Sequence, residues 1–198
     1  MYLACLLAAA GLIGGAGAPA ARAAGGGAAA ATAATPASGG AAQKQSAERQ
    51  AVLDEALKHI GKPYRSPASA PASFDCSAFA GYVFKQAVGQ NLPSSSAAFA
   101  SVGETITFKD ARPGDILIFV NPIGSTKIDH VGILYQKSES GELRGSQVIH
   151  AISVAGGQAV LKGSPTGVVL YELGKRGDGN WQKEYFLSRH FKTIRVLP

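Results

Sequence analysis

The order in which hydrophobic periodicity changes along the chain limits the fold more than any other feature of the sequence. Up to residue 88, large apolar side chains recur at three- and four-residue spacing, which is typical of helices. From residue 115 onward they form short runs separated by turn residues, which is typical of strands. The predicted elements are helices at 47–60, 76–88 and 94–101 and strands at 115–120, 129–136, 147–153, 167–173 and 192–197. Helices first and strands afterwards predict an α+β domain with an antiparallel sheet.

The first predicted helix has recognisable ends and one apolar face. Ser46 is a suitable N-cap residue, and Gly61 followed by Pro63 ends the helical pattern. The residues expected on the buried face are Val52, Leu53, Ala56, Leu57 and Ile60.

The N-terminal 45 residues lack the side chains needed for a core. Residues 3–13 are apolar, and small-residue sites follow at 18–20 and 21–23, which is the layout of a secretory signal peptide without its usual basic start. We therefore expect a signal peptide at 1–23, a flexible Ala/Gly-rich linker at 24–45 and a folded domain at 46–198. The protein is then exported to the periplasm, cell wall or extracellular space, with no stable membrane insertion after cleavage. Lipid attachment at Cys5 is a less favoured alternative, because Cys5 lies very close to the start.

The charge of the chain favours an anionic polymer as partner over nucleic acid. The formal charge is +6, from 19 basic and 13 acidic residues. A mildly basic exported protein is suited to an anionic cell wall. The basic residues are scattered and no zinc-finger or RNP-like motif occurs, so nucleic acid is not expected as a partner.

Cys76 is the one thiol that remains after removal of the signal segment. It follows Asp75, a good N-cap residue, and so falls in the first turn of the second predicted helix. Backbone N–H groups and the helix dipole at that position favour thiolate, so we expect a lowered pKa and a nucleophilic role. The alternative is a buried structural cysteine that behaves as a small hydrophobic residue.

Two of the four histidines are candidates for the base that a cysteine nucleophile needs. His130 and His150 each interrupt an otherwise apolar strand, and they can pair across neighbouring strands. His59 suits the end of the first helix, and His190 lies in a polar segment expected at the surface. Asp129 is a poor partner for His130, because adjacent strand residues face opposite sides.

Six short motifs, taken together, resemble the NlpC-type cell-wall cysteine peptidases of the NlpC/p60 superfamily, which are papain-like. They are Gly61-Lys62-Pro63-Tyr64, Phe74-Asp75-Cys76-Ser77, Leu92-Pro93 with Ser96, Pro113-Gly114-Asp115, His130-Val131-Gly132-Ile133 and Ile149-His150-Ala151. The resemblance implies a nucleophile helix packed on an antiparallel sheet that carries the histidines. It also implies hydrolysis of peptidoglycan stem peptides, often between D-glutamate and diaminopimelate.

Carried over by position, the resemblance makes Cys76 the nucleophile, His130 the base and His150 the group that orients the base. Tyr64 lines the site, and Asp75 and Ser77 help to bind the N-terminal side of the substrate. Ala78, Ser94 and Phe99 depart from the usual family residues, which leaves the stem-peptide specificity open.

The mechanism that follows is acyl transfer through a Cys76 acyl-enzyme. One cysteine and two separated histidines do not form a zinc set, so we expect no metal or other cofactor. We expect a monomer. The alternatives are another amidase or acyltransferase of the same superfamily, or a wall-binding protein that has the fold without the activity.

Overall fold

The computed structural model describes residues 37–121, 123–153, 166–174 and 186–198, all within one compact unit that spans residues 36–198. The helical elements are α1 (Ala37–Leu57), α2 (Cys76–Val88), η1 (Ser96–Ser101) and η2 (Phe108–Asp110). The strands are β1 (Glu104–Ile106), β2 (Ile116–Val120), β3 (Ile128–Gln136), β4 (Gln147–Ile152), β5 (Gly167–Glu172) and β6 (His190–Arg195). They form one sheet in the order β1-β6-β2-β3-β4-β5, and every neighbouring pair is antiparallel. The predicted α+β architecture is confirmed.

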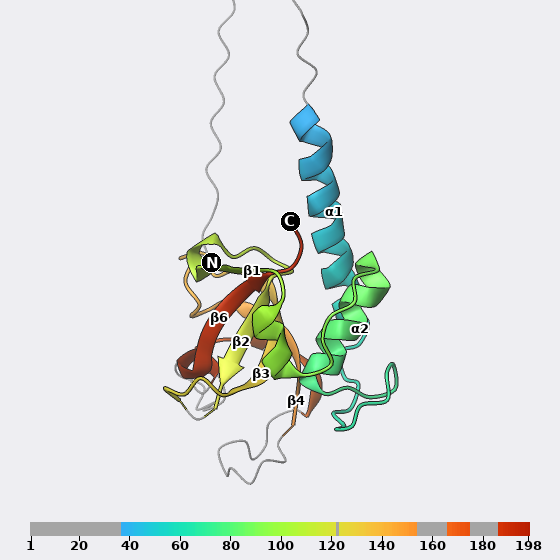
Figure 1. The fold of residues 1–198 in the computed structure, drawn as a ribbon, viewed down its shortest axis with the longest axis vertical. Coiled ribbons are helices and arrows are strands. Elements are labelled where there is room, and N and C mark those ends of the chain that lie inside the picture. Colours follow the sequence, from blue (N-terminus) through green and yellow to red (C-terminus); the bar gives the residue numbers. More distant parts are fainter. Residues whose placement is uncertain (1–36, 122, 154–165, 175–185) are drawn as a thin grey trace, which may run out of the picture. The chain divides into compact units, whose positions relative to one another are not determined.

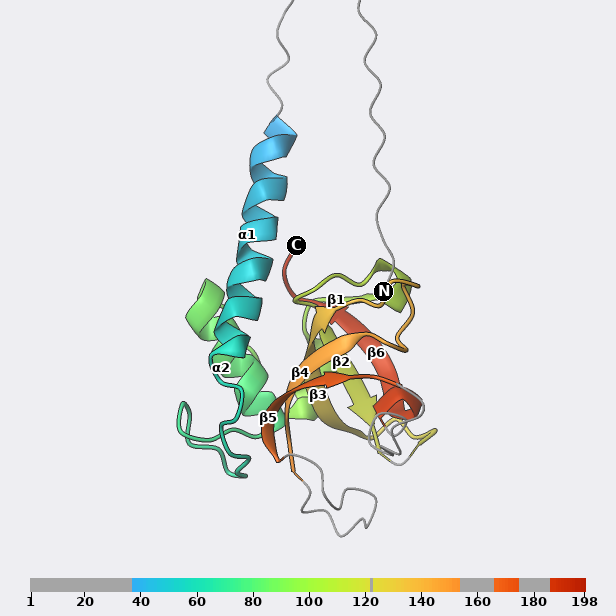
Figure 2. The ribbon, with the colours of Figure 1, turned by 180° about the vertical axis from the view of Figure 1, so that it is seen from behind.

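Helix α1 differs from its prediction at both ends. It begins at Ala37 instead of Ala47, and its first turns extend past the sheet in Figures 1 and 2. Residues 41–45 are alanine, glutamine and lysine, which are good helix formers and explain helix in that part of the predicted linker; Gly39 and Gly40 are not explained in this way. The chain leaves the helix at Leu57, so Ile60 is 46% exposed and its predicted place on the buried face is wrong.

The predicted core face of α1 is otherwise confirmed. Val52, Leu53 and Ala56 are buried, and Leu57 packs against the same cluster. The predicted signal peptide and most of the predicted linker lie outside the described residues, so their cleavage and mobility stay predictions.

Helix α2 has the predicted caps. The Asp75 side chain accepts a hydrogen bond from the Ala78 backbone N–H at 2.8 Å, as an N-cap residue should. Gly89 ends the helix with φ 71°, in the left-handed conformation that glycine adopts without strain.

The five predicted strands are all present, within two residues at each end. The sheet also contains a sixth strand, β1, which was not predicted because it has three residues and no buried side chain. The predicted short helix at 94–101 is a 3₁₀ turn, η1.

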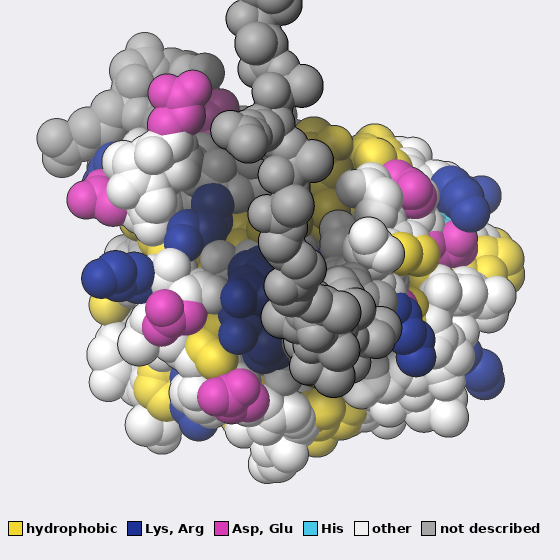
Figure 3. All heavy atoms as spheres, turned by 90° about the horizontal axis from the view of Figure 1, so that it is seen from above, with side chains coloured by type: hydrophobic (Ala, Val, Ile, Leu, Met, Phe, Trp, Pro, Cys, Tyr) yellow, Lys and Arg dark blue, Asp and Glu magenta, His cyan; other side chains and the backbone are white. Residues whose placement is uncertain are grey.

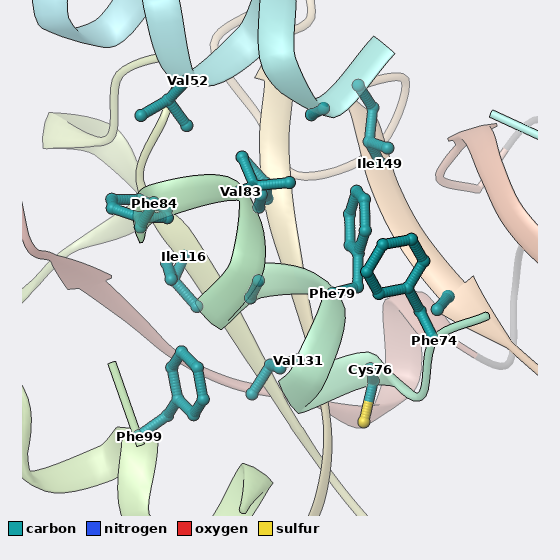
Figure 4. Close-up of a cluster of buried hydrophobic side chains, with 14 of the residues drawn as sticks. Val52, Phe74, Cys76, Phe79, Val83, Phe84, Phe99, Ile116, Val131 and Ile149 are labelled. Carbon is teal, nitrogen blue, oxygen red and sulfur yellow. The ribbon is translucent and has the colours of Figure 1, made fainter. Parts of the chain in front are cut away.

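The two faces of the sheet carry two separate clusters of buried side chains. Val131, Ile133, Ile149 and Ala151 face the helices and join the cluster around Phe79 and Phe84 that Figure 4 shows. Leu117, Phe119, Leu134 and Val148 face the other side. Because strand residues alternate between faces, His130 and His150 belong to the side opposite the helices.

The described surface carries both signs of charge. On the face shown in Figure 3, Lys and Arg side chains are interspersed with Asp and Glu side chains. Within the described ranges, no helix has the length and apolar character needed to cross a membrane.

Candidate active site

Cys76 lies where strands β3 and β4 separate. The strands pair at Ile133↔Ile149, Leu134↔Val148 and Gln136↔Gln147, and no residue of β3 before Ile133 pairs with β4. In the part of β3 that precedes Ile133, the backbone N–H and C=O groups on the β4 side therefore do not pair with β4. Cys76 Sγ occupies this position and donates a hydrogen bond to the Asp129 carbonyl oxygen, 3.9 Å away. In Figure 4 the sulfur points away from the aromatic rings of the core.

Burial controls the protonation of this thiol. Cys76 is only 7% exposed, and burial raises the pKa of its thiol to about 11. The Val131 and Ser77 backbone N–H groups act in the opposite direction, while the negative charges of Asp75 and Asp129 raise the pKa further. The predicted lowering of the Cys76 pKa is therefore wrong for the free protein, because loss of solvation outweighs the N–H groups at the helix start.

His130 and His150 form a direct side-chain pair. His130 Nε2 lies 2.9 Å from His150 Nδ1, and the two rings meet edge to face with centroids 5.0 Å apart. His130 is 9% exposed and His150 is fully buried. The Phe186 ring packs against both imidazoles, with centroids 5.1 and 4.8 Å away. The predicted pairing of the two histidines across neighbouring strands is confirmed.

Both imidazoles are neutral at neutral pH. Burial lowers the pKa of His130 well below its usual value, and the nearby His150 and Arg189 lower it further. Burial alone lowers the pKa of His150 to about 3. A neutral pair shares one N–H between the facing nitrogens, so one ring donates and the other accepts.

Gly132 gives the two histidine strands room to approach. A Cβ atom at this position would lie 2.7 Å from Val148 Cγ1 and 3.2 Å from His150 Cβ. Gly132 shares the sheet face of His130, two residues along β3. The glycine of the His-Val-Gly motif therefore has a spatial role that the sequence analysis did not assign.

Asp129 is held by an arginine that the sequence analysis did not identify. Arg189 Nη2 lies 2.5 Å from Asp129 Oδ1, and Arg189 Nε donates to the Val120 carbonyl oxygen. Asp129 thus pairs with Arg189, and the expectation that it is a poor partner for His130 agrees with this. The hydrogen bond from Cys76 goes to the backbone oxygen of this same residue.

The neighbouring His190 is not the surface residue that was expected. It is half-buried, its Nε2 lies 3.1 Å from Thr193 Oγ1, and burial lowers its pKa to about 4. The polar residues around it in the sequence concealed its ring contacts with Phe108 and Phe119.

The Gly61–Tyr64 segment is fixed between β5 and the nucleophile helix. Gly61 N donates to the Val168 oxygen, and Val168 N donates to the Lys62 oxygen, each at 2.8 Å. Tyr64 then forms a bridge with Phe74, two residues before Cys76. Burial raises the pKa of Tyr64, and the charges of Cys76, Asp75 and Asp129 raise it further. The bridge thus ties Tyr64 to the residue two positions before Cys76, and the part of Tyr64 in lining the site stays a prediction.

Asp75 and Ser77 are joined to each other beside the thiol. Ser77 Oγ donates a hydrogen bond that is shared between Asp75 Oδ1 and the Ser94 carbonyl oxygen, both 2.9 Å away. Ser77 is 5% exposed, whereas Asp75 is half-buried. The carboxylate of Asp75 is therefore the more accessible of the two groups.

The described residues that could ligate a metal are not clustered. Across residues 37–121, 123–153, 166–174 and 186–198, no group of three or more His, Cys, Asp or Glu side chains is placed to hold a metal ion. The structure pairs the two neutral imidazoles with each other and places the thiol against the backbone of β3. Among the described residues it records no direct contact between Cys76 Sγ and either imidazole.

Known proteins with similar sequences are longer than the segment that they share with this chain. The chain is 44% identical over 91 residues to a "probable endopeptidase p60" of Listeria grayi, covering 46% of this chain and 17% of the relative. It is 43% identical over 83 residues to a "gamma-DL-glutamyl hydrolase" of Bacillus subtilis, covering 41% and 20%. A "probable endopeptidase" of Corynebacterium glutamicum is 38% identical over 104 residues, covering 52% and 43%. The match thus spans less than half of each of these relatives.

Solved structures share the fold. A crystal structure of an NlpC/P60 family protein from Bacillus cereus superposes with a TM-score of 0.58 at 19% identity, over 76% of this chain and 40% of that one. The NlpC/p60 domain of the peptidoglycan hydrolase SagA superposes with a TM-score of 0.52 at 25% identity, over 74% of this chain and 97% of the domain. The model of the NlpC/P60 family matches residues 61–188, from the segment that fixes Tyr64 to the segment that precedes β6, and the chain therefore belongs to the NlpC/P60 family.

Proposed function

We propose that this protein is an exported cysteine endopeptidase that hydrolyses peptidoglycan stem peptides. The observation that carries the proposal is the placement of the Cys76 thiol against the backbone of Asp129, directly before His130, while His130 Nε2 lies 2.9 Å from His150 Nδ1. A nucleophile, a base and a partner for the base are the three parts that acyl transfer by a thiol requires.

Each member of this set has a distinct role. His150 accepts the N–H of His130 Nε2, which leaves the lone pair of His130 Nδ1 for the thiol proton. As that proton moves to Nδ1, Cys76 Sγ attacks the scissile carbonyl carbon, and backbone N–H groups at the start of α2 donate to the oxyanion. The His130 proton then goes to the leaving amine. Water, deprotonated by His130, attacks the thioester and releases the acid and the free thiol.

The resting protonation states are consistent with this sequence of steps. The thiol is protonated and both imidazoles are neutral, so the free protein holds no thiolate–imidazolium pair at neutral pH. Proton transfer from the thiol to His130 therefore accompanies the attack. The backbone N–H groups of Val131 and Ser77 stabilise the negative charge that develops on Cys76 Sγ.

The names of the relatives support a γ-glutamyl bond as target. One relative is named a gamma-DL-glutamyl hydrolase and two are named probable endopeptidases. In stem peptides the bond between D-glutamate and diaminopimelate is a γ-glutamyl amide, and this is the bond we assign to the enzyme. Tyr64 and Asp75 bind the N-terminal side of the substrate, and Ser77 keeps Asp75 in place through their hydrogen bond.

The organisation of the chain fits this function. The catalytic domain begins with α1 at Ala37 and not at the expected residue 46. A cleaved signal peptide at 1–23 delivers it outside the cell, and the Ala/Gly-rich residues up to position 36 separate the two. The domain acts as a monomer, and it has a net positive charge that suits an anionic wall.

Digestion of purified muropeptides with mass analysis of the products tests the proposal. The expected products are a fragment that ends in D-glutamate and a fragment that begins with diaminopimelate. Cys76→Ala should release neither, and Lys85→Ala, an exposed change on the same helix, should leave the product pattern unchanged. Release at a different amide would assign another bond, and binding to the wall without any product would make the protein a binding module.

A further inference from the structure

A groove of about 730 Å³ lies beside the candidate active site, between the segment after α1 and the ends of β4 and β5. Its described lining residues are Gly61, Pro63, Tyr64, Arg65, Ser66, Ser153 and Thr166. Tyr64 links the groove to the candidate active site, because it lines the groove and also forms a bridge with Phe74, two residues before Cys76.

Arg65 is the one charged residue among these lining residues. Its side chain is exposed, and within the described part of the chain that side chain makes no hydrogen bond or ion pair. Arg49, by contrast, binds Asp115 and the Leu197 oxygen through its guanidinium group. Arg65 therefore brings an uncompensated positive charge to the groove.

The backbone of Arg65 is fixed even though its side chain is exposed. Arg65 N donates to the Phe74 oxygen at 3.0 Å, and Phe74 N donates to the Pro63 oxygen at 3.1 Å. The neighbouring bridge between Tyr64 and Phe74 ties the same segment to the residue two positions before Cys76. The origin of the arginine side chain thus has a set position relative to the nucleophile.

One lining residue of the groove lies a short way along the chain from His150. Ser153, at the edge of the groove, follows His150 by three residues on the β4 path. At ~3.3 Å per strand residue, that separation is about 10 Å. An extended peptide covers the same distance with about three residues.

We propose that this groove is a carboxylate-binding subsite in which Arg65 pairs with a free carboxylate of the peptide substrate. A guanidinium group beside the hydroxyls of Ser66 and Thr166 offers hydrogen-bond donors to a carboxylate, and Arg binds carboxylates in a two-pronged geometry. The inference rests on the proposed function and extends it to specificity: stem peptides with a free carboxylate at the matching position bind more tightly than the same peptides with that group amidated.

Binding is measured with Cys76→Ala as the background, so that no peptide is consumed. The probes are synthetic stem peptides in which the α-carboxylate of D-glutamate, the side-chain carboxylate of diaminopimelate and the C-terminal carboxylate are amidated one at a time. Arg65→Gln is compared with Arg65→Lys and with Lys62→Gln, a neighbouring exposed cation outside the groove. Calorimetry gives the Kd of each pair.

Arg65→Gln should weaken binding of the unmodified peptide roughly 10-fold, as expected for one charge-assisted hydrogen-bonded pair. Amidation of one particular carboxylate should weaken binding to the protein that retains Arg65 by a similar factor and abolish the effect of Arg65→Gln. Arg65→Lys should retain part of the affinity, and Lys62→Gln should retain all of it.

Several results would overturn the subsite. The first is an equal Kd with and without the Arg65→Gln substitution. The second is an equal loss of affinity, on Arg65→Gln, for the acid and the amidated peptides. The third is no measurable binding of the unmodified peptide to the Cys76→Ala background. Cleavage by the protein with Cys76 intact is scored separately. A protein that cleaves stem peptides with no dependence on Arg65 refutes the subsite alone. A protein that binds them through Arg65 but cleaves none supports the subsite and refutes the peptidase proposal.

Discussion

His130 Nε2 faces His150 Nδ1 at 2.9 Å, and this contact determines which nitrogen of His130 is free for chemistry. When His150 Nδ1 accepts, His130 carries its proton on Nε2 and presents a lone pair at Nδ1. In the opposite tautomer His130 has its proton on Nδ1 and cannot act as a base there. Within the described residues His150 Nε2 has no hydrogen-bond partner, so the contact with His130 is the polar interaction that orients this ring.

The role of His150 as an acceptor predicts partial rescue by an amide. His150→Gln retains a carbonyl oxygen for the His130 N–H, whereas His150→Ala retains no acceptor. We expect kcat to fall about 100-fold in His150→Ala and clearly less in His150→Gln, since general acid–base help is worth roughly 10²–10⁴-fold in total. Stopped assays give kcat for both variants, and thermal melting confirms that both are folded. Equal losses in two folded variants would contradict the acceptor role.

Gly132 predicts a way to disturb the histidine pair without changing either histidine. In Gly132→Ala the new methyl group lies 2.7 Å from Val148 Cγ1 and 3.2 Å from His150 Cβ, so the side chains of β4 around His150 must shift. We expect a lower kcat, and we expect Val148→Ala in the same chain to restore part of it by removing the crowded atom. Gly81→Ala is the matched control, because a Cβ there meets only carbonyl oxygens at 3.8 and 3.9 Å. An unchanged kcat in Gly132→Ala would show that β4 accommodates the methyl group.

The protonated state of Cys76 predicts the pH dependence of its alkylation in the free protein. Because burial raises the pKa of the thiol to about 11, the rate with iodoacetamide should be slower at pH 7.5 than that of free cysteine. The alkylation rate of Cys76 should still increase with pH above pH 9. Mass spectrometry of the alkylated protein at fixed times gives the rates, and denatured protein is the control. A plateau reached below pH 8 would show a thiolate that the buried environment does not predict.

The buried histidines predict a loss of stability in mild acid. Burial lowers the pKa of His150 to about 3 and of His190 to about 4, and it also lowers the pKa of His130. As pH falls below ~6.5, the unfolded chain takes up protons that the folded chain refuses, so the free energy of unfolding decreases. Each histidine contributes a slope of up to about 1.4 kcal/mol per pH unit.

Urea unfolding between pH 7 and pH 5 measures this slope above the range where most carboxylates titrate. His190 lies outside the catalytic set. His190→Gln should therefore reduce the pH slope of the free energy of unfolding by the contribution of one histidine. A free energy of unfolding that stays constant from pH 7 to pH 5 would mean that the folded protein binds these protons as readily as the unfolded chain.

The sequence was most informative where local chemistry determines local structure. The Asp75 cap, the Gly89 end of α2 and the five main strands were all predicted, because caps, turns and apolar runs act over a few residues. The pairing of His130 with His150 was predicted for the same reason: each histidine interrupts a recognisable strand, and the two strands are consecutive.

The errors arose where distant segments decide the outcome. The pKa of Cys76 depends on how deeply α2 packs against β3, which a helix-start argument does not contain. Arg189 comes from the last strand region and reaches Asp129 across 60 positions of sequence. The separation of β3 from β4 before Ile133, which makes room for the thiol, is an early end of strand pairing that the apolar pattern of either strand does not show.

Mass analysis of the intact enzyme after rapid acid quench tests the central claim, that Cys76 attacks the substrate and His130 assists it. With a stem peptide in excess, a fraction of the wild-type chain should gain the mass of the acyl fragment, located to the peptide that contains Cys76. The adduct should be absent in Cys76→Ala and should form much more slowly in His130→Ala. Product release without any adduct on Cys76, together with continued turnover by Cys76→Ala, would contradict the account and make the thiol a structural residue.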